Sequence, residues 1–398
     1  MTWCNPIKFF AVLCGLFLSP AQALAATGTQ APSAYQYQPQ SEDERSLWLA
    51  MEEEERSIKN SKFLITDVEL NAYIRSILCK TVGDIRCGSA RIYLMRTAQF
   101  NASMAPNGMM VVWSGLLLRA RNEAELATVL GHEFAHFENQ HSLKSLINLR
   151  SKTNTMKMLS FVPYVGVVGQ IGLVGSIFSF SRDMERQADL AALSYMKNSG
   201  YDPMAASEIW EQLRAEMDAT AIERKLKSQK DNNGGFFATH PNSGERMMYL
   251  RDMARAMASQ NTGSIKQKNS EQYRKALAKW WPKLIDDQIK LNDFGATEFL
   301  LNNGSNNGSN KGWDTEILFA RGELYRSRGK KDDFAKAADF YQKAIDAGNA
   351  PPECWRGLGL SLMRLGEVTS GQKALQIYVK KQPEAADREM IQMMAESK

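Results

Sequence analysis

Three of the four histidines in this 398-residue chain lie within ten consecutive positions. His132, Glu133 and His136 form the pattern His-Glu-x-x-His. Residues four apart share one face of an α-helix, so the two imidazoles can bind a single metal ion. Glu133 is turned roughly 100° from His132 on a helix of about 3.6 residues per turn. Its carboxylate is therefore expected beside a metal-bound water, and the pattern is the sequence form of a zinc peptidase site.

A catalytic zinc ion usually takes three protein ligands and leaves a fourth position for water. The candidate third ligand is Glu185, in the segment 181–189. Asp189 lies four residues further on, on the same helical face, and can accept a hydrogen bond that fixes the tautomer of a ligand histidine. Glu185 alone would be interpreted as a surface acid, but this pairing downstream of the two histidines favours a metal site.

The remaining chemistry-bearing residues are less constrained by spacing. His240 precedes Pro241 in a loop-like segment and can donate to the oxyanion formed when a peptide carbonyl is attacked. Arg246 can hold this loop or a carboxylate. His141 lies about 140° round a continuous helix from His136, so we interpret it as structural or solvent-facing and not as a ligand.

Several local signals predict the elements that position these residues. Ser41 and Glu44 form a capping box before a helix whose acidic run, 52–55, is expected to be a solvated face. Asp67 is expected to cap a helix over 68–78. Short β-rich runs at 92–95 and 109–113 flank a hairpin signal at Asn107-Gly108, and a helix opened by Arg121 or Asn122 leads into His132.

The N-terminus predicts export. An apolar run at 9–18 is followed by a Pro and by small residues that offer cleavage sites, so 1–25 is expected to be a signal peptide and the product periplasmic. Cys79 and Cys87 are close enough in sequence to form a disulfide in an oxidising compartment. Free buried thiols at these positions and at Cys354 are the alternative.

The segment 158–181 carries no charged residue, yet it contains a proline and four glycines. Its length suits a membrane span. Its composition favours a buried hairpin or a lid near the active site, and membrane contact through 158–181 stays open as an alternative.

From about residue 265 the chain is strongly helical, with small and aromatic residues at tetratricopeptide spacing. The residues that carry this spacing are Trp280, Leu284, Ala296, Leu300, Gly322, Tyr325, Ala337, Tyr341, Ala344, Trp355, Leu358, Gly359, Gly371, Leu375, Tyr378 and Pro383. An Asn-rich stretch at 302–310 interrupts the series. An ordinary helical bundle with accidental spacing is the alternative.

Composition agrees with two folded domains. Apolar residues make up 44% of the chain, and the formal charge is +5 with bases dispersed among acids, which gives no clustered nucleic-acid footprint. We expect an α+β, mainly α fold. A gluzincin-like zinc peptidase domain with a small β-sheet at 41–260 would be followed by an α-helical tetratricopeptide-type repeat domain at 265–398.

The segments around His132, Glu185 and His240 together resemble the gluzincin peptidases of the HtpX, Oma and CAAX-prenyl-protease family. The Asn101–Leu117 stretch also resembles the edge-strand region of that family. An export signal with C-terminal tetratricopeptide units is most similar to the BepA-type periplasmic proteases. The resemblance spans roughly 47–250.

This resemblance implies a zinc endopeptidase with one Zn²⁺ per chain. His132, His136 and Glu185 would be the ligands and Glu133 the general base. His240 would act near the transition state or as a reversible fourth ligand, and Asp189 and Arg246 would support the site. The implied substrates are unfolded or misassembled proteins, with the outer-membrane protein assembly machinery as a partner.

Three functions compete at this point. The first is the protease, in which the strand at 109–113 or its hairpin partner pairs with an extended substrate. The second is a mainly chaperone or adaptor protein that acts through its repeats with a latent zinc site. The third is processing of prenyl or lipid-linked peptides in a membrane, which the export signal disfavours.

Overall fold

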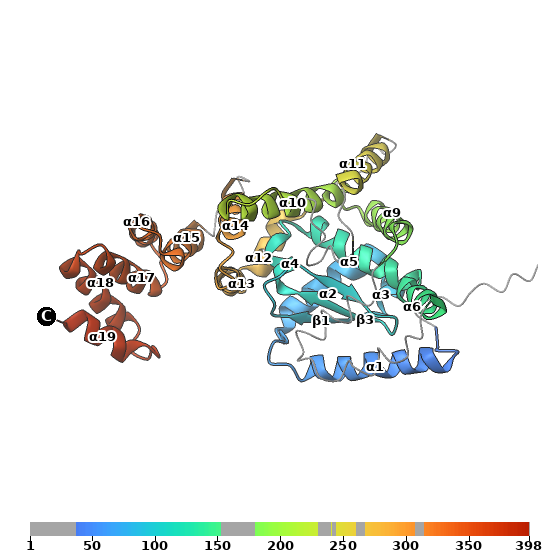
Figure 1. Cartoon of the computed structure of the whole chain (residues 1–398), viewed down its shortest axis with the longest axis horizontal. Coiled ribbons are helices and arrows are strands. Elements are labelled where there is room, and N and C mark those ends of the chain that lie inside the picture. The colour runs from blue at the N-terminus through green and yellow to red at the C-terminus, as the bar shows by residue number, and fades with distance from the viewer. Residues whose placement is uncertain are drawn as a thin grey trace, which may run out of the picture.

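The computed structural model describes residues 37–152, 180–229, 240, 244–259, 267–306 and 314–397. The expected signal peptide and nearly all of 158–181 lie outside these ranges. The described elements are α1 (Glu42–Lys59), α2 (Val68–Val82), α3 (Asp84–Cys87), β1 (Arg91–Met95), β2 (Ala102–Met104), β3 (Met109–Trp113), α4 (Ser114–Arg119), α5 (Glu123–Glu138), α6 (His141–Lys152), α9 (Arg182–Ser199), α10 (Ala205–Glu223), α11 (Gly244–Ser259), α12 (Ser270–Leu277), α13 (Trp281–Ile289), α14 (Phe294–Asn306), α15 (Asp314–Arg328), α16 (Asp333–Asp346), α17 (Glu353–Arg364), α18 (Val368–Lys381) and α19 (Arg388–Glu396). The fold is α+β and mainly α, as predicted (Figure 1).

The small sheet has the strand order β1-β3-β2. The Asn107-Gly108 turn joins β2 to β3 in an antiparallel hairpin, and Gly108 takes the positive φ of +87° that such turns require. β1 pairs with β3 in parallel. β3 is therefore the central strand of the sheet, so the expectation that 109–113 itself receives a substrate strand is wrong. Of the two strands of this hairpin, β2 is the one that lies at an edge of the sheet.

The helix starts follow the predicted caps. Ser41 Oγ accepts from Glu44 N at 3.2 Å, and an Asp67 carboxylate oxygen accepts from Leu70 N at 3.0 Å. Asn122 caps α5. α2 runs one turn further than expected, to Val82, because Ile77, Leu78 and Val82 stay buried along it.

The acidic run 52–55 departs from expectation, because half of it is buried. Glu54 and Glu55 are nearly excluded from solvent. Glu55 accepts two hydrogen bonds of 2.7 Å from Arg91 and one of 2.6 Å from Tyr93. These bonds lower the pKa of Glu55 to about 2, since they favour its charged form. α1 thus packs against the sheet with this carboxylate inside the contact.

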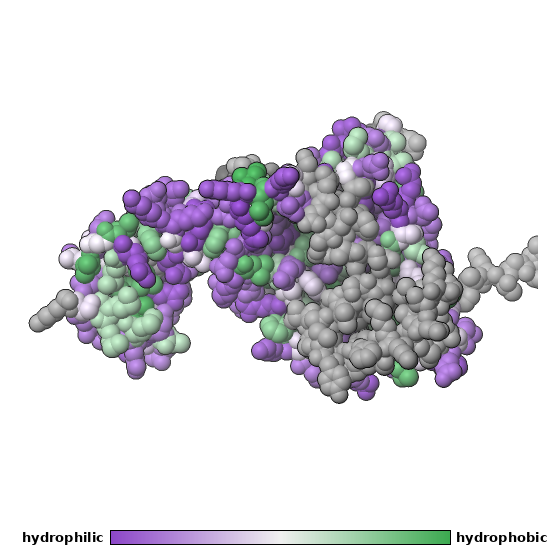
Figure 2. All heavy atoms as spheres, viewed as in Figure 1, coloured by the Kyte–Doolittle hydropathy of each residue, from purple (hydrophilic) through white to green (hydrophobic). Residues whose placement is uncertain are grey.

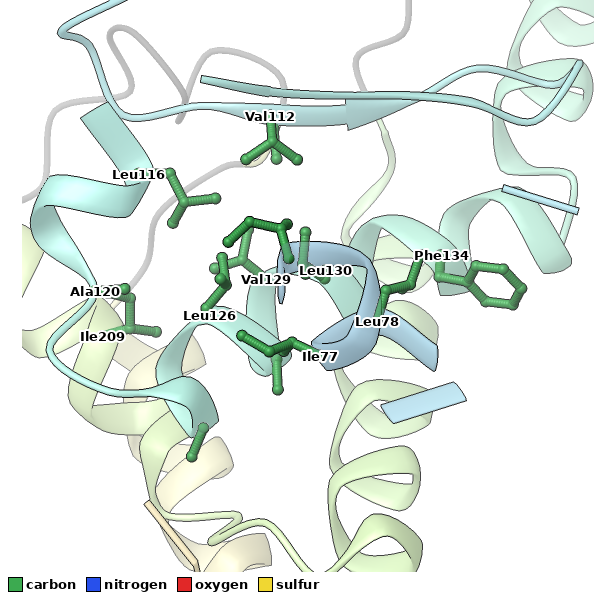
Figure 3. Close-up of a cluster of buried hydrophobic side chains, with 14 of the residues drawn as sticks. Ile77, Leu78, Val112, Leu116, Ala120, Leu126, Val129, Leu130, Phe134 and Ile209 are labelled. Atoms are coloured by element: carbon green, nitrogen blue, oxygen red, sulfur yellow. The ribbon is translucent and has the colours of Figure 1, made fainter. Parts of the chain in front are cut away.

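α5 lies at the centre of the hydrophobic core of the expected peptidase domain, which we call the peptidase-side core. Every residue from Glu123 to Phe137 is buried, as expected for a helix enclosed on all sides. Figure 3 shows the surrounding side chains, which are Val112 and Leu116 on one side of Leu126, Val129 and Leu130, and Ile77 and Leu78 on the other. Because α5 is fixed on all sides, the histidines at its end have a rigid base.

The cysteine alternatives are resolved by the structure. Cys79 and Cys87 form a disulfide that ties the end of α2 to α3. Cys354 is a buried free thiol.

The helices after residue 267 divide into two groups. α12 and α13 pack into the peptidase-side core, where Tyr273, Leu277 and Leu284 are buried. The Tyr273 hydroxyl donates to the carbonyl of Leu117 at 2.8 Å. α15 to α19 instead pack each against the next and extend away from the sheet (Figure 1).

The outer helices meet at small residues. A Cβ on Gly357 would lie 2.2 Å from the ring of Tyr341, and one on Gly322 would lie 2.5 Å from the same ring. Tyr325 and Tyr341 are buried, whereas Trp280 and Trp355 are only partly buried. The Asn-rich stretch is helical up to Asn306, where α14 ends.

No helix within the described ranges combines the length and the apolar character needed to cross a bilayer. Hydrophilic residues cover most of the coloured surface in Figure 2.

Candidate metal centre

Four side chains from three separate parts of the chain converge at one buried point. α5 supplies His132 and His136, α9 supplies Glu185, and His240 comes from the segment before α11. All four are buried, and their ligand atoms lie within 4.8 Å of one another. The structure therefore brings together all three sequence-predicted ligands, and His240 with them.

The spacing of these atoms fits one tetrahedral ion. Ligand atoms about 2.0–2.1 Å from a zinc ion at tetrahedral angles stand roughly 3.3 Å apart. His132 Nε2 lies 3.0 Å from His136 Nε2 and 3.3 Å from His240 Nδ1. Glu185 lies 3.5 Å from His132 Nε2 and 3.4 Å from His136 Nε2. A set of imidazole nitrogens and one carboxylate at this spacing is the donor chemistry that zinc prefers.

Glu133 lies beside this group and outside it. Its Oε1 is buried without a hydrogen-bond partner among the described residues and lies 3.5 Å from His240 Nε2. Burial raises the pKa of Glu133, because the low dielectric disfavours its charged form. The carboxylate is thus placed to accept a proton from a water at the site.

The predicted supporting residues Asp189 and Arg246 lie around His132, the first of the candidate ligands. Asp189 Oδ1 lies 3.0 Å from His132 Nδ1. The Arg246 guanidinium donates to Asp189 at 2.6 and 2.7 Å and forms an ion pair with Glu185 at 2.9 Å. Burial alone would raise the pKa of Asp189, but Arg246 and His132 hold it below its usual range. Tyr249 donates to Asp189 as well. The sequence analysis missed Tyr249, although it follows Arg246 by three residues on the same helix.

The two ligand histidines have opposite electrostatic surroundings. Burial lowers the pKa of His136, so the neutral imidazole is favoured. Burial also opposes the charge on His132, but Asp189 and Glu185 outweigh it and raise the pKa of His132 to about 9. A metal ion at this centre therefore competes with a proton at His132.

His141 is buried, so its interpretation as solvent-facing is wrong, while the structural alternative agrees with its position. Its Nδ1 lies 3.0 Å from His136 Nδ1, and its Nε2 lies 3.2 Å from Gln187 Oε1. The prediction assumed one continuous helix, whereas α5 ends at Glu138 and α6 begins at His141.

Two aromatic side chains without any sequence signal close the centre. The Phe180 ring stacks on His136 with centroids 3.9 Å apart and an interplanar angle of 24°. Trp210 of α10 lies edge-on to His132 at 6.5 Å, and Arg246 sits over its ring at 4.8 Å. Neither contact could be foreseen from spacing, because both residues are distant from the ligands in sequence.

With this geometry in place, comparisons with known proteins become informative. Residues 69–254 match the model of peptidase family M48. The chain is 31% identical over 151 residues to a mitochondrial metalloendopeptidase OMA1 of Arabidopsis thaliana, a match that covers 38% of this chain and 28% of the relative. It is 27% identical over 225 residues to a beta-barrel assembly-enhancing protease of Yersinia pestis, covering 52% of this chain and 44% of the relative.

A third relative is the mitochondrial metalloendopeptidase OMA1 of Schizosaccharomyces pombe, 27% identical over 195 residues and covering 48% of this chain and 52% of the relative. These matches span between about a quarter and about a half of the length of each relative. The region that is similar to family M48, residues 69–254, contains all four groups of the centre.

Proposed function

We propose that this protein is a zinc-dependent endopeptidase that cleaves unfolded or misassembled proteins in the periplasm, in the quality control of outer-membrane proteins. The observation that carries the proposal is the buried convergence of His132, His136 and Glu185 with Glu133 beside them. The relatives named beta-barrel assembly-enhancing protease support the biological setting.

In this proposal His132, His136 and Glu185 hold one zinc ion. When bound, such an ion lowers the pKa of a water and polarises a peptide carbonyl. Glu133 takes the proton of the attacking water on its buried Oε1 and passes it to the leaving amine. Its raised pKa helps the first of these transfers, because it makes the carboxylate a stronger base.

His240 is proposed as a fourth ligand that keeps the centre latent until substrate displaces it. Its Nδ1 lies 2.9 Å from Glu185 Oε1 and 3.3 Å from His132 Nε2, on the ligand side of the ring. His240→Ala should retain zinc and raise peptide turnover. Lower turnover would instead support a role at the oxyanion, and unchanged turnover would contradict both roles.

Metal content and casein proteolysis, measured on the same preparations, test the enzyme proposal. Glu133→Gln should keep one zinc per chain and lose proteolysis, because Glu133 acts on water. Glu69→Gln, on the exposed face of α2, is the matched control and should change neither property. Full activity of Glu133→Gln would remove Glu133 as the base.

The ligand assignment is tested separately. Glu185→Ala should bind zinc much more weakly, since only two of the three protein ligands and His240 remain. Undiminished zinc content in that variant would overturn the assignment.

Extended substrates are proposed to pair with β2. It is the edge strand of the sheet beside β3, so its outer backbone groups can bond to an added strand. Unfolded segments offer such strands and folded ones do not. The protein should therefore cleave unfolded casein faster than a compact globular protein.

We propose that the helices α15 to α19 are tetratricopeptide-type units that bind a partner protein. By likeness to the relatives named beta-barrel assembly-enhancing protease, the proposed partner is the outer-membrane protein assembly machinery. A pull-down should compare the full chain with a chain ending at residue 306, after zinc content has been measured in both. Equal recovery of the partner would exclude these helices as the recruitment surface.

One observation favours the adaptor alternative. All four groups of the centre are buried, and Phe180 stacks directly on His136. If Phe180 never uncovered the centre, the protein would act through the helices α15 to α19 alone. Zinc binding without proteolysis of casein, in both wild type and His240→Ala, would support that alternative.

A further inference from the structure

Outside the four groups that converge at the centre, one polar chain of contacts reaches a metal-ligating side chain from the surface. It runs from the exposed Gln187 through the buried His141 to His136. We propose that His141, oriented by Gln187, is a positioning residue that fixes the tautomer and ring orientation of His136. This inference rests on the proposed function, in which His136 binds zinc.

The direction of each hydrogen bond follows from the geometry. His136 Nε2 faces the other ligand atoms, 3.0 Å from His132 Nε2 and 3.4 Å from Glu185 Oε1. If Nε2 binds the metal, the single proton of the neutral ring lies on Nδ1. That Nδ1 lies 3.0 Å from His141 Nδ1, which must then accept. His141 consequently carries its own proton on Nε2 and donates it to Gln187 Oε1 at 3.2 Å.

The backbone turn at Gln140 makes this contact possible. On a continuous helix, a side chain five residues on would point away from His136. Instead Gln140 adopts a left-handed conformation with φ of +55°, and its carbonyl accepts from Lys144 N to open α6. A glutamine rarely takes this conformation, so the surrounding structure holds it there. This turn places the ring of His141 against that of His136, with the two ring centroids 4.9 Å apart.

The two ligand histidines are thus supported by different acceptors. His132 has the carboxylate of Asp189 at 3.0 Å, whereas His136 has a neutral imidazole. α9 carries the supporting groups of both, Asp189 and Gln187, and it also carries the ligand Glu185, two residues before Gln187. The helix α9 therefore supplies one ligand, Glu185, and supports the side chains of the other two, His132 and His136.

Zinc affinity, measured by competition with a chelator, is the first test. His141→Phe keeps a ring of similar size but offers no acceptor, and should weaken zinc binding about 10- to 100-fold. His141→Asn, whose side-chain oxygen can reach the place of Nδ1, should restore most of the affinity. Gln187→Leu should give a smaller loss than His141→Phe.

The second readout is the ring tautomer, which a merely structural role would not fix. The chain has only four histidines, and all four lie at this centre, so the imidazole ¹⁵N spectrum of the zinc-loaded protein reports on nothing else. His136 should carry its proton on Nδ1 in wild type and in His141→Asn, and lose this preference in His141→Phe.

The outcomes separate the two hypotheses. If wild type binds no zinc, the proposed function fails and the inference with it. If wild type binds zinc while His141→Phe binds it equally well, or His141→Asn is as weak as His141→Phe, only the role of His141 is overturned. If His141→Phe misfolds, His141→Asn is compared with wild type instead, and a loss of zinc affinity of about 10-fold or more in His141→Asn contradicts the proposal.

Discussion

The metal centre and the outer helical array, α15 to α19, are stabilised in different ways. At the centre, buried charged groups satisfy one another, as Arg246 does with Asp189 and Glu185. In the array, an aromatic ring fills the space left by glycines, as Tyr341 does between Gly322 and Gly357. The centre joins residues up to 114 positions apart, whereas each array helix packs chiefly on its neighbour in sequence.

This difference teaches where the molecule tolerates change. A charge network fails as a unit, because removal of one partner leaves another charge buried and unpaired. A stack of helices loses stability locally and passes the effect to adjacent units. The following predictions test that contrast, from the largest effect to the smallest.

The largest effect is expected where α12 and α13 meet the rest of the peptidase-side core. A chain ending at 266 loses Tyr273, Leu277 and Leu284 from the peptidase-side core. Each buried side chain of this kind contributes about 1.5–3 kcal/mol, so the loss exceeds roughly 5 kcal/mol and should unfold the remainder. A chain ending at 306 keeps α12 and α13 and should retain cooperative melting and zinc. Equal melting of both chains would contradict this placement of the boundary.

The next effect concerns a buried ion pair next to that contact. Arg119 bonds Glu216 at 2.6 Å and the side chain of Gln288 at 3.0 Å, and both charged groups are buried. Arg119→Leu should lower the free energy of unfolding by about 3–5 kcal/mol, because Glu216 is left without its partner. Urea denaturation measures this change.

Arg96 offers the matched control for that prediction. It pairs with Asp287 at 2.6 Å across the same two regions, but 40% of its side chain is exposed. Arg96→Leu should cost less than about 1 kcal/mol, since water screens such pairs. Similar costs for the two variants would mean that burial does not decide the strength of this contact.

The acid stability of the peptidase-side region should depend on Glu55. Its pKa is lowered to about 2 in the folded state, so its stabilising contribution is complete above the unfolded value of about 4.5 and is lost as pH falls towards 2. Glu55→Gln should remove roughly 2–3 kcal/mol at neutral pH and flatten the pH dependence of unfolding between about 4.5 and 2. Glu53→Gln, at an exposed position of α1, is the control and should leave the curve unchanged.

The smallest effect is expected within the array. Gly357→Ala places a methyl group 2.2 Å from the Tyr341 ring, which must shift, at a cost of about 1–3 kcal/mol. Gly366→Asn is the control, since Gly366 has φ of +85°, which Asn tolerates, and open space around it. Zinc content should be the same in both variants. Loss of zinc in Gly357→Ala would show that the array and the centre are coupled.

Much of the local structure could be predicted because its causes are local. Ser41, Asp67 and Asn122 cap helices through their own side chains, and the Asn107-Gly108 turn forms a hairpin through its own backbone preference. The spacing that places His132 and His136 on one face of a helix is likewise contained within five residues. The burial of Glu55 could not be predicted, because its partners Arg91 and Tyr93 belong to a strand that comes close to α1 only when the chain folds.

The types of candidate ligand, their helical spacing and the helices that carry them could be predicted from the sequence alone. Tertiary structure alone decided that β3 would be the central strand, because strand order depends on how β1 crosses over to it. It also decided that Phe180 would cover His136, and that His141 would turn back towards it. Such contacts depend on the packing of distant segments and on one left-handed residue, Gln140, so no local periodicity encodes them.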